Sequence, residues 1–185
     1  QRHSRRVTDL AVAIAERMNL SRSDIEALRF ATILHDIGKI GVRDSILMKP
    51  GRLTDEEYQK IKNHPLIGDR IIAPLGLTEV ERRIIRHHHE RVDGRGYPDG
   101  LKGDEIYILA RIASVADAFD AMTSTRSYRQ ARSPEEAIQE ISRCGGTQFD
   151  LGVVQCLSEG LAAGMIALGS PEDRMAEFSG EEMAI

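Results

Sequence analysis

The histidines are the feature of this sequence that most constrains its fold. All six lie in the first half of the 185 residues, and His35 is followed directly by Asp36. A lone histidine is more often a surface or core residue than a metal ligand. Several histidines in separate segments, with a carboxylate beside one of them, are instead typical of a metal site that several helices assemble. The six are His3, His35, His64, His87, His88 and His89.

Helical spacing separates inward-facing from outward-facing histidines. The apolar residues between 78 and 90 recur at helical spacing, and His88 and His89 follow Ile84 and Ile85 by four residues. Side chains four residues apart share a helix face, so both histidines are predicted to point inward. His87 follows Arg83 by four residues, on a basic face, and is interpreted as solvated.

Asp36 lies in apolar company, between Leu34 and Ile37. Burying an unpaired carboxylate is very costly, so Asp36 needs a strong partner. A metal cation is one such partner, and a buried salt bridge is the other. Lys39 is the only cation close in sequence, which favours the metal.

Asp117 is the second candidate carboxylate, on a helix face shared with Ala113 and Ala121. Small side chains there allow close packing against other ligand helices, and a helix-surface aspartate is the alternative. Asp120, one turn on, is a candidate partner that orients a histidine. His64 precedes Pro65 at a helix junction, where a capping role and a ligand role remain about equally supported.

Length and composition predict one all-α domain. Hydrophobic residues make up 41% of the chain, charged residues 29% and aromatic residues 4%. The net charge of −4 excludes a general polyanion-binding surface, so no nucleic acid is expected as a partner. Two distant cysteines exclude a zinc ribbon or a disulfide framework. No membrane-spanning stretch or signal peptide is visible, and a cytoplasmic setting is expected.

Capping patterns and apolar spacing predict the helices. The chain begins within an apolar helical stripe that includes His3, so it is expected to be a piece of something longer, with an incomplete first helix in a domain over 1–169 and an acidic tail or linker over 170–185. A helix is predicted over 108–123, loops over 41–53 and 91–103, and no strand of useful length. Four capping boxes predict helix starts: Ser23 with Glu26, Thr54 with Glu57, Thr78 with Glu81, and Ser133 with Glu136.

The donor set suits phosphate-ester hydrolysis. Two metal ions about 3.5 to 4 Å apart can generate hydroxide at neutral pH, neutralise the phosphoryl oxygens and stabilise the leaving oxygen. Such a pair needs imidazoles for each ion and a carboxylate that joins them. Asp36, beside His35, is suited to that role.

Five ordered blocks of this sequence resemble the HD-GYP branch of the HD phosphohydrolase superfamily. HDIGK resembles the HD motif, and HHERVDGRGYP resembles the signature that defines the branch. The resemblance extends over nearly the whole chain except the tail, and the ordered set is very specific. The blocks are HDIGK (35–39), HHERVDGRGYP (88–98), VADAFDAM (115–122), RSYR (126–129) and GGTQFD (145–150).

The resemblance implies an all-helical HD-domain bundle with a short glycine-rich GYP loop. It implies a cyclic di-GMP phosphodiesterase that yields linear pGpG and in some members GMP, by a metal-activated hydroxide attacking phosphorus at a bridged metal pair. It also implies two divalent ions, iron or manganese before nickel or zinc. A third ion in some members uses a glutamate four residues before the position of His3, which this chain cannot supply. The implied ligands are His3, His35, Asp36 (bridging), His64, His88, His89 and Asp117.

The implied substrate side has four candidates, each with a plainer alternative. Lys39, also a catalytic candidate with Asp36, either binds a phosphate oxygen or pairs with the buried carboxylate. Arg126 and Arg129 either grip a phosphate or form a solvated basic patch. Tyr97 either contacts a guanine or phosphate or stiffens its own loop.

Two other functions remain open from the sequence. One is hydrolysis of another cyclic dinucleotide, since residues that bind phosphate do not select a base. The other is a non-catalytic binding or docking module, in which the GYP loop meets partner proteins. The family resemblance further implies GGDEF-type or other signalling partners and an upstream sensor or receiver domain.

Overall fold

The computed structural model describes residues 2–125 and 131–166. Within them the ordered elements are helices, and the predicted all-α class is confirmed. The α-helices are α1 (Arg2–Arg17), α2 (Arg22–Leu34), α3 (Asp44–Leu47), α4 (Asp55–Lys62), α5 (His64–Ile72), α6 (Glu79–His87), α7 (Ile108–Thr123), α8 (Pro134–Arg143) and α9 (Leu151–Ala162). The 3-10 turns are η1 (Ile37–Gly41), η2 (Ala73–Leu75) and η3 (Gly103–Glu105).

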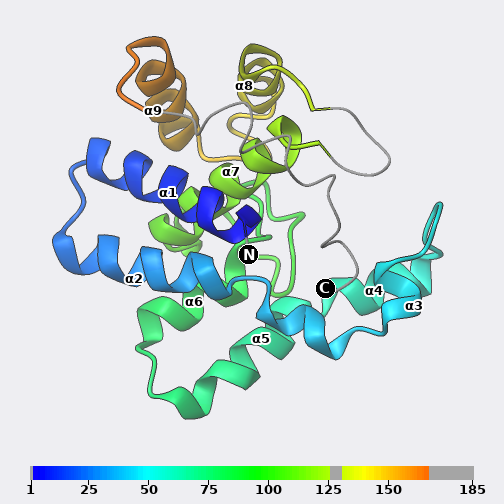
Figure 1. Ribbon diagram of the computed structural model, residues 1–185. Coiled ribbons are helices and arrows are strands. Elements are labelled where there is room, and N and C mark those ends of the chain that lie inside the picture. The colour runs from blue at the N-terminus through cyan, green and yellow to red at the C-terminus, as the bar shows by residue number, and fades with distance from the viewer. Residues whose placement is uncertain (1, 126–130, 167–185) are drawn as a thin grey trace.

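Helix α7 lies at the centre of the molecule, between the α1–α2 pair and the α8–α9 pair (Figure 1). It begins and ends where the sequence predicted. Ala110, Ala113 and Ala116 are buried in it, and their small side chains let α1 pack closely against it. Phe119 and Ile112 fill the core around them. The helix therefore holds Asp117 rigidly near the middle of the fold.

Three of the four predicted capping boxes are confirmed, those that begin with Thr54, Thr78 and Ser133. The prediction for Ser23 was wrong, because Ser21 caps α2 and accepts a hydrogen bond from the Asp24 amide at 3.1 Å. Both serines compete for one helix start. The Asp24 carboxylate also accepts a hydrogen bond from the Tyr107 hydroxyl at 3.1 Å, a tertiary contact that local spacing does not reveal.

One of the two loop predictions was wrong and the other is confirmed. The segment 41–53 contains the short helix α3, so its prediction as a continuous loop was wrong. The segment 91–103 is irregular as predicted, and its Asp93 pairs with Lys102 in an isolated bridge. Among the described helices, none combines the length and apolar character needed to cross a membrane. The predicted tail over 170–185 lies outside the described residues.

Candidate metal centre

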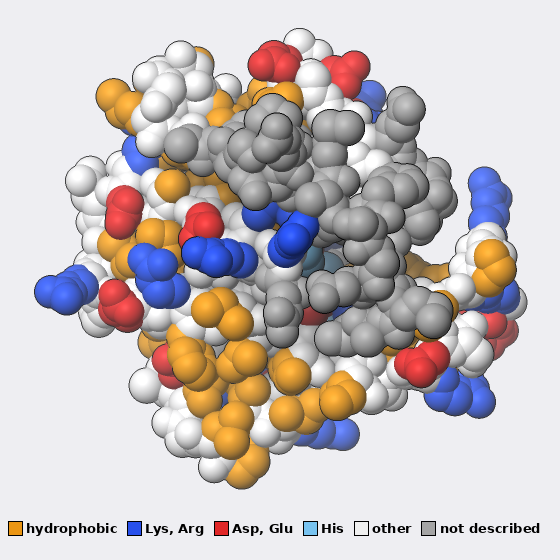
Figure 2. All heavy atoms as spheres, in the orientation of Figure 1, with side chains coloured by type: hydrophobic (Ala, Val, Ile, Leu, Met, Phe, Trp, Pro, Cys, Tyr) orange, Lys and Arg blue, Asp and Glu red, His pale blue; other side chains and the backbone are white. Residues whose placement is uncertain are grey.

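Five segments of the fold bring the side chains of seven candidate metal ligands to one place. Figure 2 shows histidine side chains at the centre of one face, with Lys and Arg side chains beside them. The donors are His3 in α1, His35 at the end of α2 with Asp36 after it, His64 at the start of α5, His88 and His89 after α6, and Asp117 in α7. All seven are the residues that the family resemblance implied.

The donors form two groups, and within each group one candidate ligand atom per residue lies within 4.8 Å of the others. The first group contains Asp36, His64, His88 and His89. In the second, His3 Nε2 lies 3.3 Å and His35 Nε2 lies 3.9 Å from Asp117 Oδ1. Each group offers imidazoles and a carboxylate.

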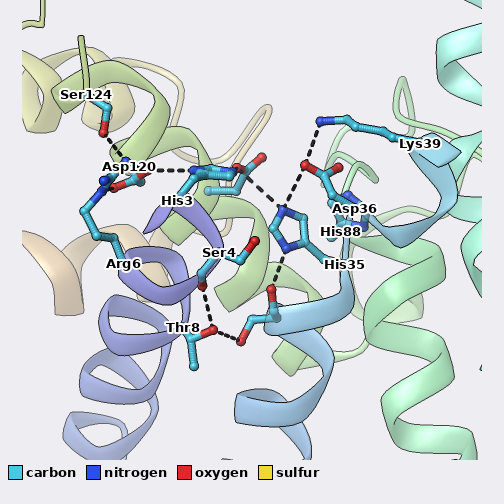
Figure 3. A network of polar contacts seen from close by, with 12 residues as sticks. His3, Ser4, Arg6, Thr8, His35, Asp36, Lys39, His88, Asp120 and Ser124 are labelled. Atoms are coloured by element: carbon cyan, nitrogen blue, oxygen red, sulfur yellow. Dashed lines mark hydrogen bonds and ion pairs between the residues drawn. The ribbon is translucent and has the colours of Figure 1, made fainter. Parts of the chain in front are cut away.

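Asp36 joins the two groups through its two oxygens. Its Oδ1 lies 3.3 Å from His64 Nε2 in the first group, and its Oδ2 lies 3.5 Å from His35 Nε2 in the second. Lys39 Nζ lies 2.6 Å from the same Oδ2. Figure 3 shows Asp36 between His35 and Lys39 in this network. One carboxylate with each oxygen directed at a different group is the arrangement that a bridging ligand needs.

Backbone carbonyls orient three of the histidines in the same way. The Nδ1 atoms of His35, His64 and His88 lie 2.6, 2.8 and 2.8 Å from the carbonyl oxygens three residues earlier. A carbonyl only accepts, so each Nδ1 carries a proton, and Nε2 is the ring atom left to face a metal ion. Such a partner on the second ring nitrogen is the usual way in which a protein orients a metal-binding histidine.

Burial keeps the first group ready to bind a cation. It lowers the pKa of His89 to about 4 and the pKa of His88 well below its usual value, so both imidazoles are neutral at pH 7. Burial would raise the pKa of Asp36, but the hydrogen bond with His64 and the charges of His35 and Lys39 hold it well below its usual range. The group therefore combines the neutral imidazoles of His88 and His89 with the ionised carboxylate of Asp36.

His3 is held by two carboxylates on α7. Its Nδ1 lies 2.7 Å from Asp120 Oδ2, and its Nε2 faces Asp117. Burial lowers the pKa of His3, but the hydrogen bonds with both carboxylates outweigh it and raise the pKa to about 9. Arg6 Nε donates to Asp120 Oδ1 at 2.6 Å, which ties the carboxylate in place (Figure 3). Asp120 thus takes the orienting position that the sequence suggested.

The donor chemistry fits divalent transition metals. Five imidazoles and two ionised carboxylates suit iron, manganese, nickel and zinc, whereas the absence of thiolates from both groups disfavours Cu(I). In the second group a metal ion would replace the proton between His3 and Asp117, a coupling expected whenever protons and metals share ligands.

His87 corrects one sequence prediction. It was interpreted as solvated, but it is only 8% exposed. Its Nε2 bonds to Asp99 Oδ2 at 2.9 Å, and Arg86 Nε donates to the same oxygen at 2.7 Å. Asp99 belongs to the segment 91–103, which folds back towards α6, and its carboxylate contacts both Arg86 and His87 on the basic face. His87 belongs to neither group of donors.

This geometry predicts opposite outcomes for two neighbouring histidines. We expect His89→Ala to lower the metal content, since it removes a donor of the first group. We expect His87→Ala to leave the metal content unchanged and to lower the free energy of unfolding by about 1.5 kcal/mol, because a partly buried hydrogen bond to the Asp99 carboxylate is lost. Elemental analysis and denaturant titration measure both. Equal metal loss in the two variants would show that His87 is a ligand.

The structure describes two of the four candidate substrate-binding residues, Lys39 and Tyr97. Lys39 forms the ion pair with Asp36, and its ammonium still has donors available for a phosphate. The Tyr97 ring stacks on His89, with ring centroids 4.9 Å apart and planes 27° apart. Burial raises the pKa of the Tyr97 hydroxyl, which stays neutral. Arg126 and Arg129 lie outside the described residues.

Sequence reasoning assigned no role to Glu90, which is buried and organises the loop that carries Tyr97. Its carboxylate accepts hydrogen bonds from the amides of Asp99, Gly100 and Leu101 at 2.7, 3.1 and 3.1 Å. A Cβ at Gly96 would lie 2.5 Å from Glu90 Cα, so the loop can pass there only as glycine. The sequence feature that could have indicated this role is a carboxylate that directly follows two inward-facing histidines.

Comparisons with known proteins identify the family of this chain. The HD domain family matches residues 1–153. A cyclic di-GMP phosphodiesterase of Thermotoga maritima is 46% identical over 156 residues, which are 83% of this chain and 42% of the relative. A 3'3'-cGAMP-specific phosphodiesterase of Vibrio cholerae is 40% identical over 136 residues, which are 74% of this chain and 30% of the relative. This chain therefore spans less than half the length of either relative.

The solved structure of Bd1817, an HD-GYP-type protein of Bdellovibrio bacteriovorus, shares the fold. It superposes with a TM-score of 0.70 over 86% of this chain and 51% of that protein, at 22% sequence identity. At this sequence identity, the structural similarity is evidence for the fold alone.

Proposed function

This chain belongs to the HD domain family, in its HD-GYP branch, and from that membership we propose that it is a metal-dependent phosphodiesterase that hydrolyses cyclic di-GMP to linear pGpG. The observation that carries the proposal is the position of Asp36. Its two oxygens face two separate groups of imidazole donors. A pair of joined metal sites can stabilise both the attacking and the leaving oxygen during phosphodiester hydrolysis.

We assign one divalent ion to each group of donors. Asp36, His64, His88 and His89 would hold the first, and His3, His35 and Asp117 the second, with Asp36 shared. When bound, such ions lower the pKa of water and neutralise charge on the phosphoryl group. Iron or manganese is the proposed metal, with nickel and zinc as the alternatives.

The chain's own side chains would bind and orient the substrate. Lys39 is held at the edge of the centre by Asp36 and would donate to a phosphoryl oxygen as negative charge develops there. Tyr97 lies against His89 and would contact the nucleotide next to the reacting phosphate. Arg126 and Arg129 are proposed as further phosphate contacts.

A second candidate function is hydrolysis of another cyclic dinucleotide. Relatives specific for 3'3'-cGAMP resemble this chain nearly as closely as those that act on cyclic di-GMP. A non-catalytic module is less well supported, because both groups of donors are complete. Contacts of the GYP loop with GGDEF-type proteins, a sensor or receiver domain in the parent protein and a cytoplasmic setting remain proposals.

The test couples metal analysis to turnover on protein purified without oxygen. We expect two metal ions per chain, and faster hydrolysis of cyclic di-GMP than of 3'3'-cGAMP or cyclic di-AMP. Chelation should remove the activity and re-addition of metal should restore it. Faster turnover of 3'3'-cGAMP would favour the second candidate. Three tightly bound ions would contradict the assignment of one ion to each group of donors.

A further inference from the structure

Two tyrosines enclose a lysine at the edge of the metal centre. Tyr58 and Lys62 lie one turn apart on α4, and Tyr97 comes from the segment after α6. Lys62 Nζ lies 4.9 Å from the Tyr58 ring centroid and 5.4 Å from the Tyr97 ring centroid. Cation–π attraction of this kind holds an ammonium in place without using its hydrogen-bond donors on a carboxylate. We call these three residues the Tyr–Lys bracket.

Lys62 differs from two other lysines, which form ion pairs with carboxylates. Lys39 pairs with Asp36 and Lys49 pairs with Glu57, each at 2.6 Å. In the described part of the chain, no ion pair joins Lys62 to a carboxylate. Its ammonium has three donors and no acceptor, so it suits a ligand that offers acceptor atoms.

The bracket lies one aromatic ring away from the metal centre. Tyr97 stacks on His89, and Lys62 reaches the Tyr97 ring from α4. Only Asn63 separates α4 from His64, so the same short segment positions the bracket and a candidate ligand. A nucleobase is joined to its phosphate through one sugar. A phosphate at the centre therefore brings its base within reach of the bracket.

We propose that the Tyr–Lys bracket recognises a guanine of the substrate and determines its base specificity. The proposal rests on the proposed function, because it takes a cyclic dinucleotide as the ligand. Guanine presents two acceptors, O6 and N7, on one edge, whereas adenine presents N7 beside the N6 amino donor. The Lys62 ammonium matches the guanine edge and opposes the adenine amino group. The Tyr58 ring is 46% exposed and provides a face on which a base can stack.

Substitutions at Lys62 test the proposal through base preference. Arginine also matches guanine O6 and N7, whereas glutamine matches adenine N6 and N7. We expect Lys62→Arg to keep the preference for cyclic di-GMP over cyclic di-AMP. We expect Lys62→Gln to reduce that preference about tenfold, the size of one good base contact. Lys60→Gln is the matched control, since Lys60 is an exposed lysine on the same helix.

Two measurements keep this test separate from that of the proposed function. Equilibrium binding of cyclic di-GMP and cyclic di-AMP to metal-free protein reports base preference without turnover, and the ratio of kcat/KM values on metal-loaded protein reports it during turnover. Guanine-selective binding without hydrolysis would refute the proposed function and support the bracket. Equal losses for both dinucleotides in Lys62→Gln would overturn the bracket, since a phosphate contact or loop stiffening acts alike on both. An unchanged preference in Lys62→Gln would overturn it as well.

Discussion

Asp36→Ala is expected to abolish hydrolysis and to deplete bound metal. Its carboxylate is the only described group that faces both sets of donors, and without it two neighbouring cations would repel one another. Loss of a partner behind a metal ligand typically costs about 10- to 100-fold in metal affinity or activity. Loss of the shared ligand itself should therefore exceed about 100-fold. Elemental analysis and cyclic di-GMP turnover measure the two effects on the same sample.

Asp9→Ala is the matched control for this experiment, because Asp9 is an exposed aspartate on α1. It should keep both metal content and turnover. Near-normal metal content in Asp36→Ala would show that the two groups do not depend on a common carboxylate, and the proposed centre would be wrong.

Gly38→Ala is expected to destabilise the whole protein. A Cβ at this position would lie 1.8 Å from the His64 carbonyl oxygen and 2.5 Å from the Gly68 nitrogen. Both atoms belong to the backbone of α5, so relief requires the helix to move away from η1. Overpacking in a core typically costs about 1 to 3 kcal/mol, and a clash with backbone should lie at or above the upper end. Denaturant titration measures the change in the free energy of unfolding.

The same substitution should also weaken metal binding, because His64 moves with α5. Gly152→Ala is the control. A Cβ there would meet the Asp150 side chain at 3.3 Å, and Gly152 lies in helix α9. Alanine favours a helix over glycine by about 1 kcal/mol, so this variant should be neutral or slightly more stable. Equal stability of the two variants would contradict the close approach of η1 and α5.

Helical spacing was enough to predict much of the fold and of the candidate site. The limits of α7, the inward direction of His88 and His89, and the position of Asp117 on a face of small residues follow from a period of 3.6 residues. Such spacing reports which side chains share a face of one helix. The assignment of the seven donors as metal ligands came from the family resemblance, and it stays a prediction.

Helical spacing could not predict contacts between segments that are distant in sequence. His87 has the spacing of a surface residue, yet Asp99 reaches it from the following loop and buries it. The Tyr–Lys bracket likewise exists only because the segment of Tyr97 folds back towards α4.

The sequence by itself determined the limits of α7, the starts of three capped helices and the inward direction of His88 and His89, because each depends on residues within one or two helical turns. Only the tertiary structure decided that Asp36 directs one oxygen at each group and that two carboxylates of α7 hold His3. The physical reason is that these distances depend on how α1, α2, α5 and α7 pack together. A periodic pattern specifies which face is buried, but not which partner it meets.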